Sequence, residues 1–407
     1  MYYRRAIETP WLEAGEQFPV LLLTGPRQVG KTTVLKHLCG KDRRYVTLDD
    51  PNLRHLAGDD PALFLQRFPP PVLIDEIQYA PALLPQIKMI ADEQRRPGQF
   101  WLTGSQQFEM MRGISETLAG RVAIVKLLGF SLRERHRKAL DIPPFLPFGE
   151  SLDARVPSAT PTRLAGIYRD IWRGTFPALN AGSVRNRELF YSSYLQTYLQ
   201  RDIRDLRQIG NEAAFVRFLR VCAARTAQML NLSELARDAD VSVPTAKTWL
   251  SLLQTTCQVF LLRPYYTNVT KRLVKAPKLY FLDTGLCSYL TEWSSPETLE
   301  AGAMSGAVLE TFVLGEILKS WWHRMKAPPV YYYRDRDRRE VDVLFVLDQR
   351  LHPLEVKKSA TIRPAWATAF APLDRLGLPR GPGGVACLCP ELLPVSGDVS
   401  AIPVGML

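Results

Sequence analysis

The sequence predicts an α/β protein with an N-terminal domain built on a parallel sheet, a helical middle region and a small α/β domain at the C-terminal end. Three observations lead to this prediction. Strand-like apolar runs alternate with helical patterns over residues 1–140, as in the βαβ units of a parallel sheet. Helical periodicity dominates residues 164–230. Beyond residue 300, a helical pattern is followed by two apolar strands.

Composition sets the boundaries that we expect between these parts. Residues 141–163 contain five prolines and several small polar residues, which is typical of a loop or linker. This segment would separate the first domain, 1–140, from a helical region at 164–230. A second region follows at 231–290, and the C-terminal domain is expected at 300–407.

The chain has the composition of a soluble globular protein, with 407 residues, 46% of them hydrophobic and 23% charged. No apolar run of about eighteen residues occurs, so we expect no membrane span. The first residues lack an apolar signal segment, and we expect a cytoplasmic protein. The net charge of +11 favours an acidic partner such as DNA. The alternative explanations of this charge are a basic surface that binds no partner, or a source genome whose proteins are generally rich in arginine.

The most informative segment is Gly25–Thr32, which fits the phosphate-binding pattern G-x-x-x-x-G-K-[ST]. An apolar strand, Val20–Leu23, precedes it and a helical stretch, Thr33–Leu38, follows it, in the order that this P-loop requires. The expected ligands are ATP and Mg²⁺. The expected ATP-binding residues are Gly25, Pro26, Arg27, Gln28, Val29, Gly30, Lys31, Thr32, Thr33 and, from a later strand, Ser105. The alternative is a chance glycine-rich turn beside a lysine.

Within this loop, two side chains have specific chemical roles. Lys31 would contact the β- and γ-phosphates, which makes it a catalytic candidate, and Thr32 would hold Mg²⁺. Another apolar strand, Pro71–Ile74, ends in Asp75 and Glu76. We predict that Asp75 is the second Mg²⁺ anchor and that Glu76 orients or deprotonates the attacking water.

Two further candidates follow along the chain. Thr103 and Ser105 lie at the end of the strand-like run 99–105, where a polar side chain can contact the γ-phosphate. An ordinary strand-ending turn is the alternative. Arg121 opens the next apolar strand and is a candidate arginine finger, acting in its own subunit or across a homo-oligomer interface. The alternative for Arg121 is a solvated surface arginine.

At this point the sequence resembles a known family over nearly its whole length, the prokaryotic AAA-family ATPases joined to a C-terminal domain of unknown function. The matching segments are Leu23–Thr33, Leu48–Asp50, Leu73–Gln78, Leu102–Ser105, Leu118–Arg121, Trp172–Pro177, Tyr194–Asp202 and Phe281–Gly285. The resemblance implies an AAA-like P-loop domain, ATP binding and hydrolysis. It implies no cellular role.

The region at 231–290 looks like a winged helix. A short helix, Ser233–Ala239, is followed by a turn, by a second helix opened by Pro244, and by a wing strand, Val259–Leu262. Exposed Thr245, Lys247 and Thr248 would face a DNA groove. Lys247 is the only basic residue on that helix, so a docking module or a lid on the ATPase is the alternative.

The C-terminal part carries a second chemical constellation. Asp342 interrupts an apolar strand, and Glu355 and Lys357 lie two residues apart on the next strand, so their side chains share one face. Glu310 lies in the helical stretch upstream. This set resembles the PD-(D/E)xK restriction-endonuclease fold. The resemblance implies that Glu310, Asp342 and Glu355 bind a second Mg²⁺ or Mn²⁺ and that Lys357 assists the attacking water.

The alternatives for this set are a degenerate nuclease fold kept for binding, or exposed charges on an edge strand. Two hypotheses for the function therefore remain. In the first, an ATPase drives or licenses metal-dependent DNA cleavage. In the second, a nucleotide switch uses its C-terminal half only to bind DNA or a protein partner.

Overall fold

The computed structural model describes residues 2–104, 114, 116–159, 163–198 and 211–407, which form two compact units. Unit 1 comprises Met1–Phe130 with two short additions, Thr255–Cys257 and Trp322–Lys326. Unit 2 comprises Ser131–Gln254, Gln258–Trp321 and Ala327–Leu407. Among the helices of the described ranges, none combines the length and apolarity needed to cross a membrane.

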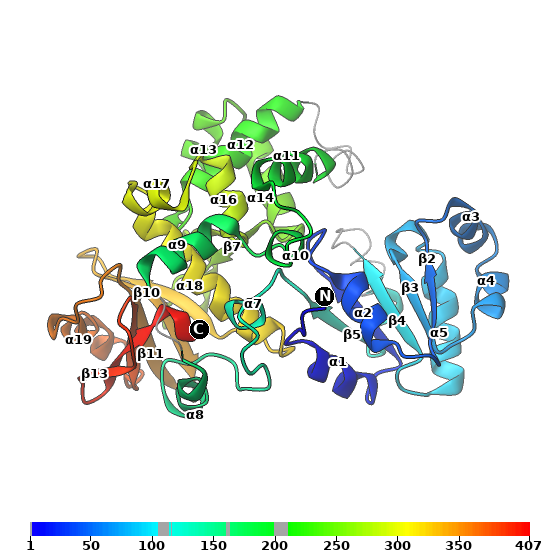
Figure 1. The fold of residues 1–407 in the computed structure, drawn as a ribbon, viewed down its shortest axis with the longest axis horizontal. Helices are drawn as coiled ribbons and strands as arrows, with labels where there is room; N and C mark the ends of the chain where they lie inside the picture. The colour runs from blue at the N-terminus through cyan, green and yellow to red at the C-terminus, as the bar shows by residue number, and fades with distance from the viewer. Residues whose placement is uncertain (1, 105–113, 115, 160–162, 199–210) are drawn as a thin grey trace. The chain divides into compact units, whose positions relative to one another are not determined.

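Unit 1 is a five-stranded parallel sheet with helices between its strands (Figure 1). The strand order is β2-β3-β4-β1-β5, and each neighbouring pair is parallel. The predicted parallel sheet is therefore confirmed. Its elements are α1 (Glu8–Gly15), β1 (Val20–Thr24), α2 (Lys31–Leu38), β2 (Arg44–Thr47), α3 (Pro51–Asp59), α4 (Pro61–Arg67), β3 (Val72–Asp75), η1 (Ile77–Tyr79), α5 (Leu83–Gln94), β4 (Phe100–Gly104) and β5 (Val122–Lys126).

Burial explains the sequence pattern of these strands. Every residue of β1, β3 and β4 is buried, which suits central strands covered on both faces. The helices α3 and α4 begin where an aspartate precedes a proline: Asp50 and Asp60 accept hydrogen bonds from backbone N–H groups of the first turn. The polar residues at or near the ends of β1, β3 and β4, namely Thr24, Asp75 and Thr103, lie at the carboxyl edge of the sheet.

Unit 2 begins with helices and ends with a mixed sheet. Its helical part comprises α7 (Leu132–Arg135), α8 (Gly149–Asp153), η2 (Val156–Ser158), α9 (Leu164–Arg173), α10 (Pro177–Asn180), α11 (Arg187–Tyr198), α12 (Glu212–Ala224), α13 (Leu232–Asp238), α14 (Val243–Thr255), α15 (Val269–Val274), α16 (Thr284–Leu290), α17 (Pro296–Ala301) and α18 (Ser305–Trp322). A small antiparallel sheet, of order β6-β8-β7, contains β6 (Gln228–Met229), β7 (Val259–Leu262) and β8 (Lys278–Phe281).

The order α12, β6, α13, α14, β7, β8 includes the two helices and the wing strand that the sequence predicts. Lys247 and Thr248 are exposed on α14, whereas the Thr245 hydroxyl lies 2.7 Å from that of Ser242. The winged-helix assignment itself stays a prediction, as does the five-part division of the chain.

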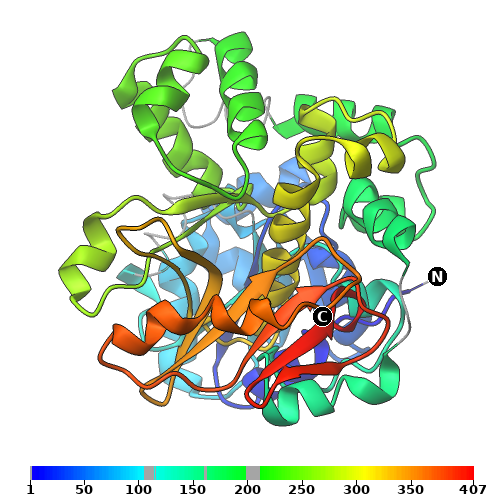
Figure 2. The same ribbon diagram turned by 90° about the vertical axis from the view of Figure 1, so that its left-hand side faces the viewer.

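A six-stranded mixed sheet forms the C-terminal part of unit 2, with α18 beside it (Figure 2). Its order is β13-β14-β12-β11-β10-β9, with parallel pairing only at β11–β12 and β12–β14. The elements are β9 (Val330–Arg334), β10 (Glu340–Leu347), β11 (Arg350–Val356), α19 (Ala365–Thr368), η5 (Ala371–Arg375), β12 (Gly383–Cys387), β13 (Leu393–Ser396), β14 (Val399–Pro403) and η6 (Val404–Met406).

The described residues of the proline-rich segment 141–163, predicted as a loop or linker, contain α8 and η2 and belong to unit 2. Phe145 is fully buried, and its backbone N–H donates to Ser320 Oγ. Arg155 is also buried and donates to the Ser151 and Pro143 carbonyl oxygens. Composition indicates the loops here, but the contact between Phe145 and Ser320 ties the segment to α18.

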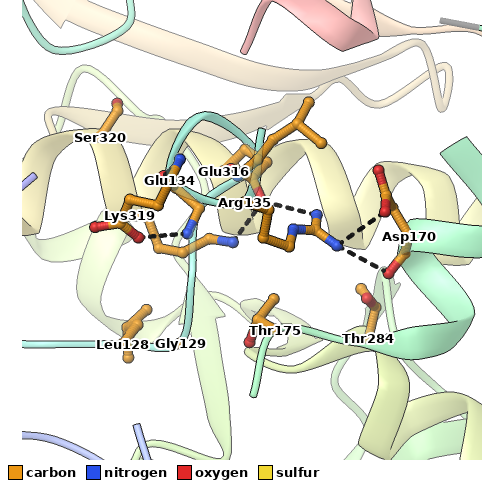
Figure 3. Close-up of polar contacts among 12 residues, drawn as sticks. Leu128, Gly129, Glu134, Arg135, Asp170, Thr175, Thr284, Glu316, Lys319 and Ser320 are labelled. Carbon is orange, nitrogen blue, oxygen red and sulfur yellow. Dashed lines mark hydrogen bonds and ion pairs between the residues drawn. The ribbon is translucent and has the colours of Figure 1, made fainter. Parts of the chain in front are cut away.

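A buried ionic network holds the first turn of unit 2 (Figure 3). Arg135 Nη1 lies 3.3 Å from Asp170 Oδ1, and Arg135 Nη2 lies 4.0 Å from Glu316 Oε1. Glu316 also pairs with Lys319 Nζ at 2.5 Å and accepts the Leu132 N–H at 2.8 Å. These ion pairs connect α7 to α9 and α18.

Candidate functional site

The P-loop predicted at Gly25–Thr32 connects β1 to α2, as the sequence indicates. Gly25 has φ 144°, and a Cβ at this position would lie 2.0 Å from the Leu127 carbonyl oxygen. Gly30 has φ 92° and precedes the first turn of α2. A positive φ favours glycine at both positions, and the close backbone contact requires it at Gly25.

Lys31 and Thr32 occupy the positions expected of a phosphate clamp and a metal ligand. The buried Lys31 Nζ donates to the carbonyl oxygens of Gly25 at 3.1 Å and Pro26 at 2.8 Å, so the ammonium lies within the loop. Thr32 Oγ1 donates to Asp75 Oδ1 at 2.9 Å and Oδ2 at 3.1 Å. Elsewhere in the loop Val29 is buried, Pro26 and Arg27 are half-buried, and Gln28 and Thr33 are exposed.

Asp75 is the centre of the polar cluster at the carboxyl edge of the sheet. Its buried carboxylate accepts hydroxyl hydrogen bonds from Thr32, from Thr103 and, at 3.1 Å, from Tyr45. Burial, followed by the charge of Asp75, raises the pKa of Tyr45 to about 12. Three hydroxyl donors hold this carboxylate in place, and carboxylate oxygens are ligands that Mg²⁺ prefers.

Glu76 follows Asp75 directly and has a left-handed backbone, with φ 60°. Its N–H donates to Thr103 Oγ1 at 3.1 Å, and its carboxylate accepts from the Gln78 side chain. The structure therefore brings Lys31, Thr32, Asp75 and Glu76 to one edge of the sheet. Ser105, the other predicted contact to nucleotide, lies outside the described residues.

Arg121 lies away from this cluster. It precedes β5, and its carbonyl oxygen accepts the N–H of Val20 at the start of β1, whereas the P-loop follows the end of β1. Its guanidinium pairs with Asp92 on α5 and donates to the Ala119 carbonyl at 2.9 Å. This position does not suit contact with the nucleotide of the same subunit, so only action in trans remains as a proposal.

Two side chains near the P-loop are absent from the sequence prediction. One is Tyr45, described above. The other is Arg5, which is 3% exposed and donates to the Val29 carbonyl at 2.8 Å and the Leu128 carbonyl at 2.7 Å. Arg5 thus supports the loop through the Val29 carbonyl oxygen. In the sequence, only its position before an apolar helix could have indicated that it is buried.

In the C-terminal part, the structure brings together the four residues of the second constellation. Glu310 lies on α18, Asp342 on β10, Glu355 at the end of β11 and Lys357 just after it. Asp342 Oδ2 accepts the N–H of Val356 at 2.9 Å, and Lys357 Nζ donates to Glu355 Oε1 at 2.7 Å. The other oxygen, Glu355 Oε2, is buried without a hydrogen-bond partner.

The pKa values of these carboxyl groups show that they influence one another. Burial, followed by the charge of Asp342, raises the pKa of Glu310 and that of Glu355 to about 7. Burial also raises the pKa of Asp342. Perturbed pKa values of this kind gather where carboxylates converge away from water.

A residue that the sequence analysis missed lies in the middle of this set. Lys278, on β8, forms ion pairs with Glu310 at 3.0 Å, with Asp342 at 3.8 Å and with Glu340. Tyr280, two residues along the same strand, donates to Glu310 Oε1 at 2.6 Å. Alternation along β8 places both side chains on one face, which is the signal that the sequence offered.

In this arrangement the residues do not fit a divalent metal ion. Within the described ranges, no group of three or more His, Cys, Asp or Glu side chains is arranged to hold a metal. In this conformation the Lys278 ammonium pairs with Glu310 and Asp342, and Lys357 pairs with Glu355. The metal role of the three carboxylates stays a prediction.

Comparison with known proteins identifies the family. The chain is 32% identical over 349 residues to Uncharacterized protein Mb2031c of Mycobacterium bovis and to Uncharacterized protein Rv2008c of Mycobacterium tuberculosis. The aligned residues cover 84% of this chain and 71% of each relative. The chain belongs to the family of these two proteins.

Three family models divide the sequence of this family member. An AAA domain matches residues 17–136, and domains of unknown function match residues 165–297 (DUF8612) and 305–407 (DUF4143). The AAA match includes the P-loop, Asp75 and Glu76, and it supports ATP binding. The match from residue 305 onwards is to a domain of unknown function, which does not show the predicted nuclease fold.

Among solved structures, the Walker-type ATPase PabY2304 of Pyrococcus abyssi is 15% identical, covers 71% of this chain and 96% of its own, and superposes with a TM-score of 0.42. DnaA of Aquifex aeolicus, in a structure with AMPPCP bound, is 12% identical, with coverage of 61% and 85% and a TM-score of 0.30. We draw no conclusion from similarities at these scores.

Proposed function

We propose that this protein is a Mg²⁺-dependent ATPase and that ATP hydrolysis is coupled to a nucleic-acid-acting module in its C-terminal half. The observation that supports ATP hydrolysis is the cluster of Lys31, Thr32, Asp75 and Glu76 at one edge of the parallel sheet, beside a P-loop with glycine at both strained positions. The AAA domain match over residues 17–136 agrees with it.

Each residue of the cluster has a role in this proposal. The Lys31 ammonium leaves the two carbonyl oxygens that it contacts and binds the terminal phosphate oxygens, whose negative charge is the stronger acceptor. The Thr32 hydroxyl and the Asp75 carboxylate supply the oxygen donors that Mg²⁺ prefers. Mg²⁺, when bound, neutralises charge on the β- and γ-phosphates.

Glu76 is the proposed residue that orients and deprotonates the attacking water. Its backbone is anchored through Thr103, a residue that also contacts Asp75, so the carboxylate is positioned relative to the metal-binding side chains. Gln78 donates to that carboxylate and fixes its direction. A fixed carboxylate near the γ-phosphate is what general-base assistance requires.

The test of this role separates binding from hydrolysis. Glu76→Gln keeps the size and the hydrogen bond with Thr103 but cannot take a proton. We expect it to bind a fluorescent ATP analogue with the affinity of the wild type and to hydrolyse ATP about 10²-fold more slowly. Loss of nucleotide binding in this variant would show that Glu76 has a different role.

DNA is the partner that we propose for the C-terminal half, and the net charge of +11 supports it. A protein partner is the alternative, because Lys247 is the single basic residue of α14, the helix predicted to enter a groove. Fluorescence anisotropy with labelled duplex DNA at low and high salt distinguishes them: binding to DNA should weaken steeply as salt rises.

Metal-dependent cleavage of DNA is a second candidate function. One observation favours it, the convergence of Glu310, Asp342, Glu355 and Lys357 in one place. The arrangement around Lys278 weighs against it, and the family match over residues 305–407, to a domain of unknown function, gives it no support. Incubation of the protein with plasmid and linear DNA, Mg²⁺ or Mn²⁺, and with or without ATP tests it, with Asp342→Ala as the control.

A further inference from the structure

A buried cation from another region of the chain lies among the carboxylates of the C-terminal part. Lys278 belongs to β8, inside the segment matched by DUF8612, whereas Glu310, Glu340 and Asp342 belong to the segment matched by DUF4143. The Lys278 side chain is 4% exposed. An ammonium so fully removed from water is stable only when anionic groups compensate its charge.

The charges around Lys278 provide this compensation. Burial alone would lower the pKa of Lys278, but the carboxylates of Glu310, Asp342 and Glu340 outweigh burial and raise the pKa above its ordinary value. The three ion pairs balance the charge of the Lys278 ammonium. Tyr280 adds a hydrogen bond to Glu310 from the same strand, so two side chains of β8 are directed at one carboxylate.

The oxygens that Lys278 contacts are those that a divalent ion would need. A metal ion bonded to Glu310 and Asp342 at about 2.0–2.6 Å would overlap the space of the ammonium and repel its charge. Asp342 Oδ2 already accepts the Val356 N–H, and Glu355 Oε1 already accepts Lys357. Glu355 Oε2 remains buried and without a hydrogen-bond partner.

We propose that Lys278 is the internal cation of this cluster and excludes divalent metal ions from it, so that the cluster becomes a Mn²⁺ or Mg²⁺ site only when Lys278 is removed or withdrawn. The control would come from the middle region, because β8 carries the excluding residue and α18, β10 and β11 carry the carboxylates. The consequence for DNA cleavage rests on the second candidate function, but the metal exclusion itself does not.

The experiment measures Mn²⁺ binding by electron paramagnetic resonance of the full chain without nucleotide, so that the P-loop makes no contribution through ATP. Lys278→Met removes the charge and keeps the apolar stem. Lys275→Met is the matched control, because Lys275 is exposed on the same segment. A third variant combines Lys278→Met with Asp342→Asn, which removes a carboxylate of the cluster.

We expect the wild type and Lys275→Met to bind no Mn²⁺ at this cluster up to about 1 mM, and Lys278→Met to bind one ion at least about tenfold more tightly than that limit. The combined variant should lose this ion. Stoichiometric binding by the wild type that depends on Asp342 overturns the inference, as does a folded Lys278→Met variant that binds none.

Removal of Lys278 leaves carboxylates unpaired in the interior, so folding needs its own measurement. Lys278→Gln, whose amide can still donate to Glu310, is the milder variant and should also bind Mn²⁺. Circular dichroism follows folding with and without the metal. Variants that fold only when Mn²⁺ is added support the inference, and variants that stay unfolded with it count against it.

The outcomes are separable from those of the function proposals. ATP hydrolysis that fails in the wild type refutes the proposed ATPase and leaves the Mn²⁺ results unaffected. Wild-type DNA cleavage that is lost in Asp342→Ala supports the second candidate function and contradicts metal exclusion by Lys278. Cleavage that appears only in Lys278→Met supports both.

Discussion

Replacement of Gly25 by alanine should damage the nucleotide site, and the structure allows the loss of stability to be worked out. The added Cβ would lie 2.0 Å from the Leu127 carbonyl oxygen, and this oxygen belongs to backbone that cannot move cheaply. Crowding of this kind costs about 1–3 kcal/mol. The φ of 144° adds about 1–3 kcal/mol of backbone strain for a residue with a Cβ. The expected loss of stability is therefore about 2–6 kcal/mol.

Gly40→Ala is the matched control for this prediction. Gly40 also has a positive φ, 63°, but a Cβ there would meet nothing within 4 Å. Only the cost of the left-handed conformation remains, about 1–2 kcal/mol. Thermal unfolding followed by tryptophan fluorescence, together with titration of a fluorescent ATP analogue, should show a larger fall in melting temperature and a loss of ATP affinity in Gly25→Ala alone.

Equal effects of the two substitutions would refute this reasoning, because the clash with Leu127 would then have no consequence. Normal ATP affinity in a destabilised Gly25→Ala variant would show that the loop tolerates a different path.

Three further predictions follow from particular contacts. Asp75→Asn should lower the free energy of unfolding by about 1–3 kcal/mol, because its amide cannot accept from three hydroxyls, and it should slow ATP hydrolysis. Asp42→Asn, at an exposed position, is the control and should change neither. Mixing Arg121→Ala with Lys31→Ala subunits should restore part of the ATPase activity if Arg121 acts in trans; no recovery, with a monomer by light scattering in ATP, would assign Arg121 a structural role. Burial lowers the pKa of His352, whose Nδ1 donates to the Pro382 carbonyl. The stability that His352 contributes is therefore present above pH 6.5, its ordinary pKa, and falls as the pH drops through the lowered pKa. Denaturant unfolding of wild type and His352→Gln from pH 8 down to about pH 5 checks this, and a difference that does not shrink at low pH would contradict it.

The N-terminal sheet and the P-loop were predictable because their signals are local. Apolar runs end in Gly25 and in Asp75, and the parallel sheet brings both strand ends to the same edge. Arg5 and Tyr45 could not be predicted in the same way. The partners of Arg5 lie 24 and 123 positions away along the chain, and that of Tyr45 lies 30 positions away. A single sequence gives no register for such contacts.

In the C-terminal part, the sequence predicted the residues but not their environment. Asp342, Glu355 and Lys357 follow from strand alternation, and the structure gathers them with Glu310. Lys278 lies on β8, which no sequence motif links to a site, and its burial among carboxylates depends on tertiary packing. The metal role of these carboxylates stays a prediction, because the motif specifies the anions, whereas the cation that balances them is set by the fold.

The most direct test of the central claim is steady-state phosphate release from ATP in Mg²⁺ by the wild type, Lys31→Ala and Lys41→Ala. Lys31 lies inside the P-loop, whereas Lys41 is exposed beyond the end of α2. The account predicts hydrolysis by the wild type and Lys41→Ala, and a loss of about 10²-fold or more in Lys31→Ala, because the γ-phosphate loses its cationic contact. Equal rates in Lys31→Ala and the wild type, or no hydrolysis by a wild type that binds ATP, would contradict it.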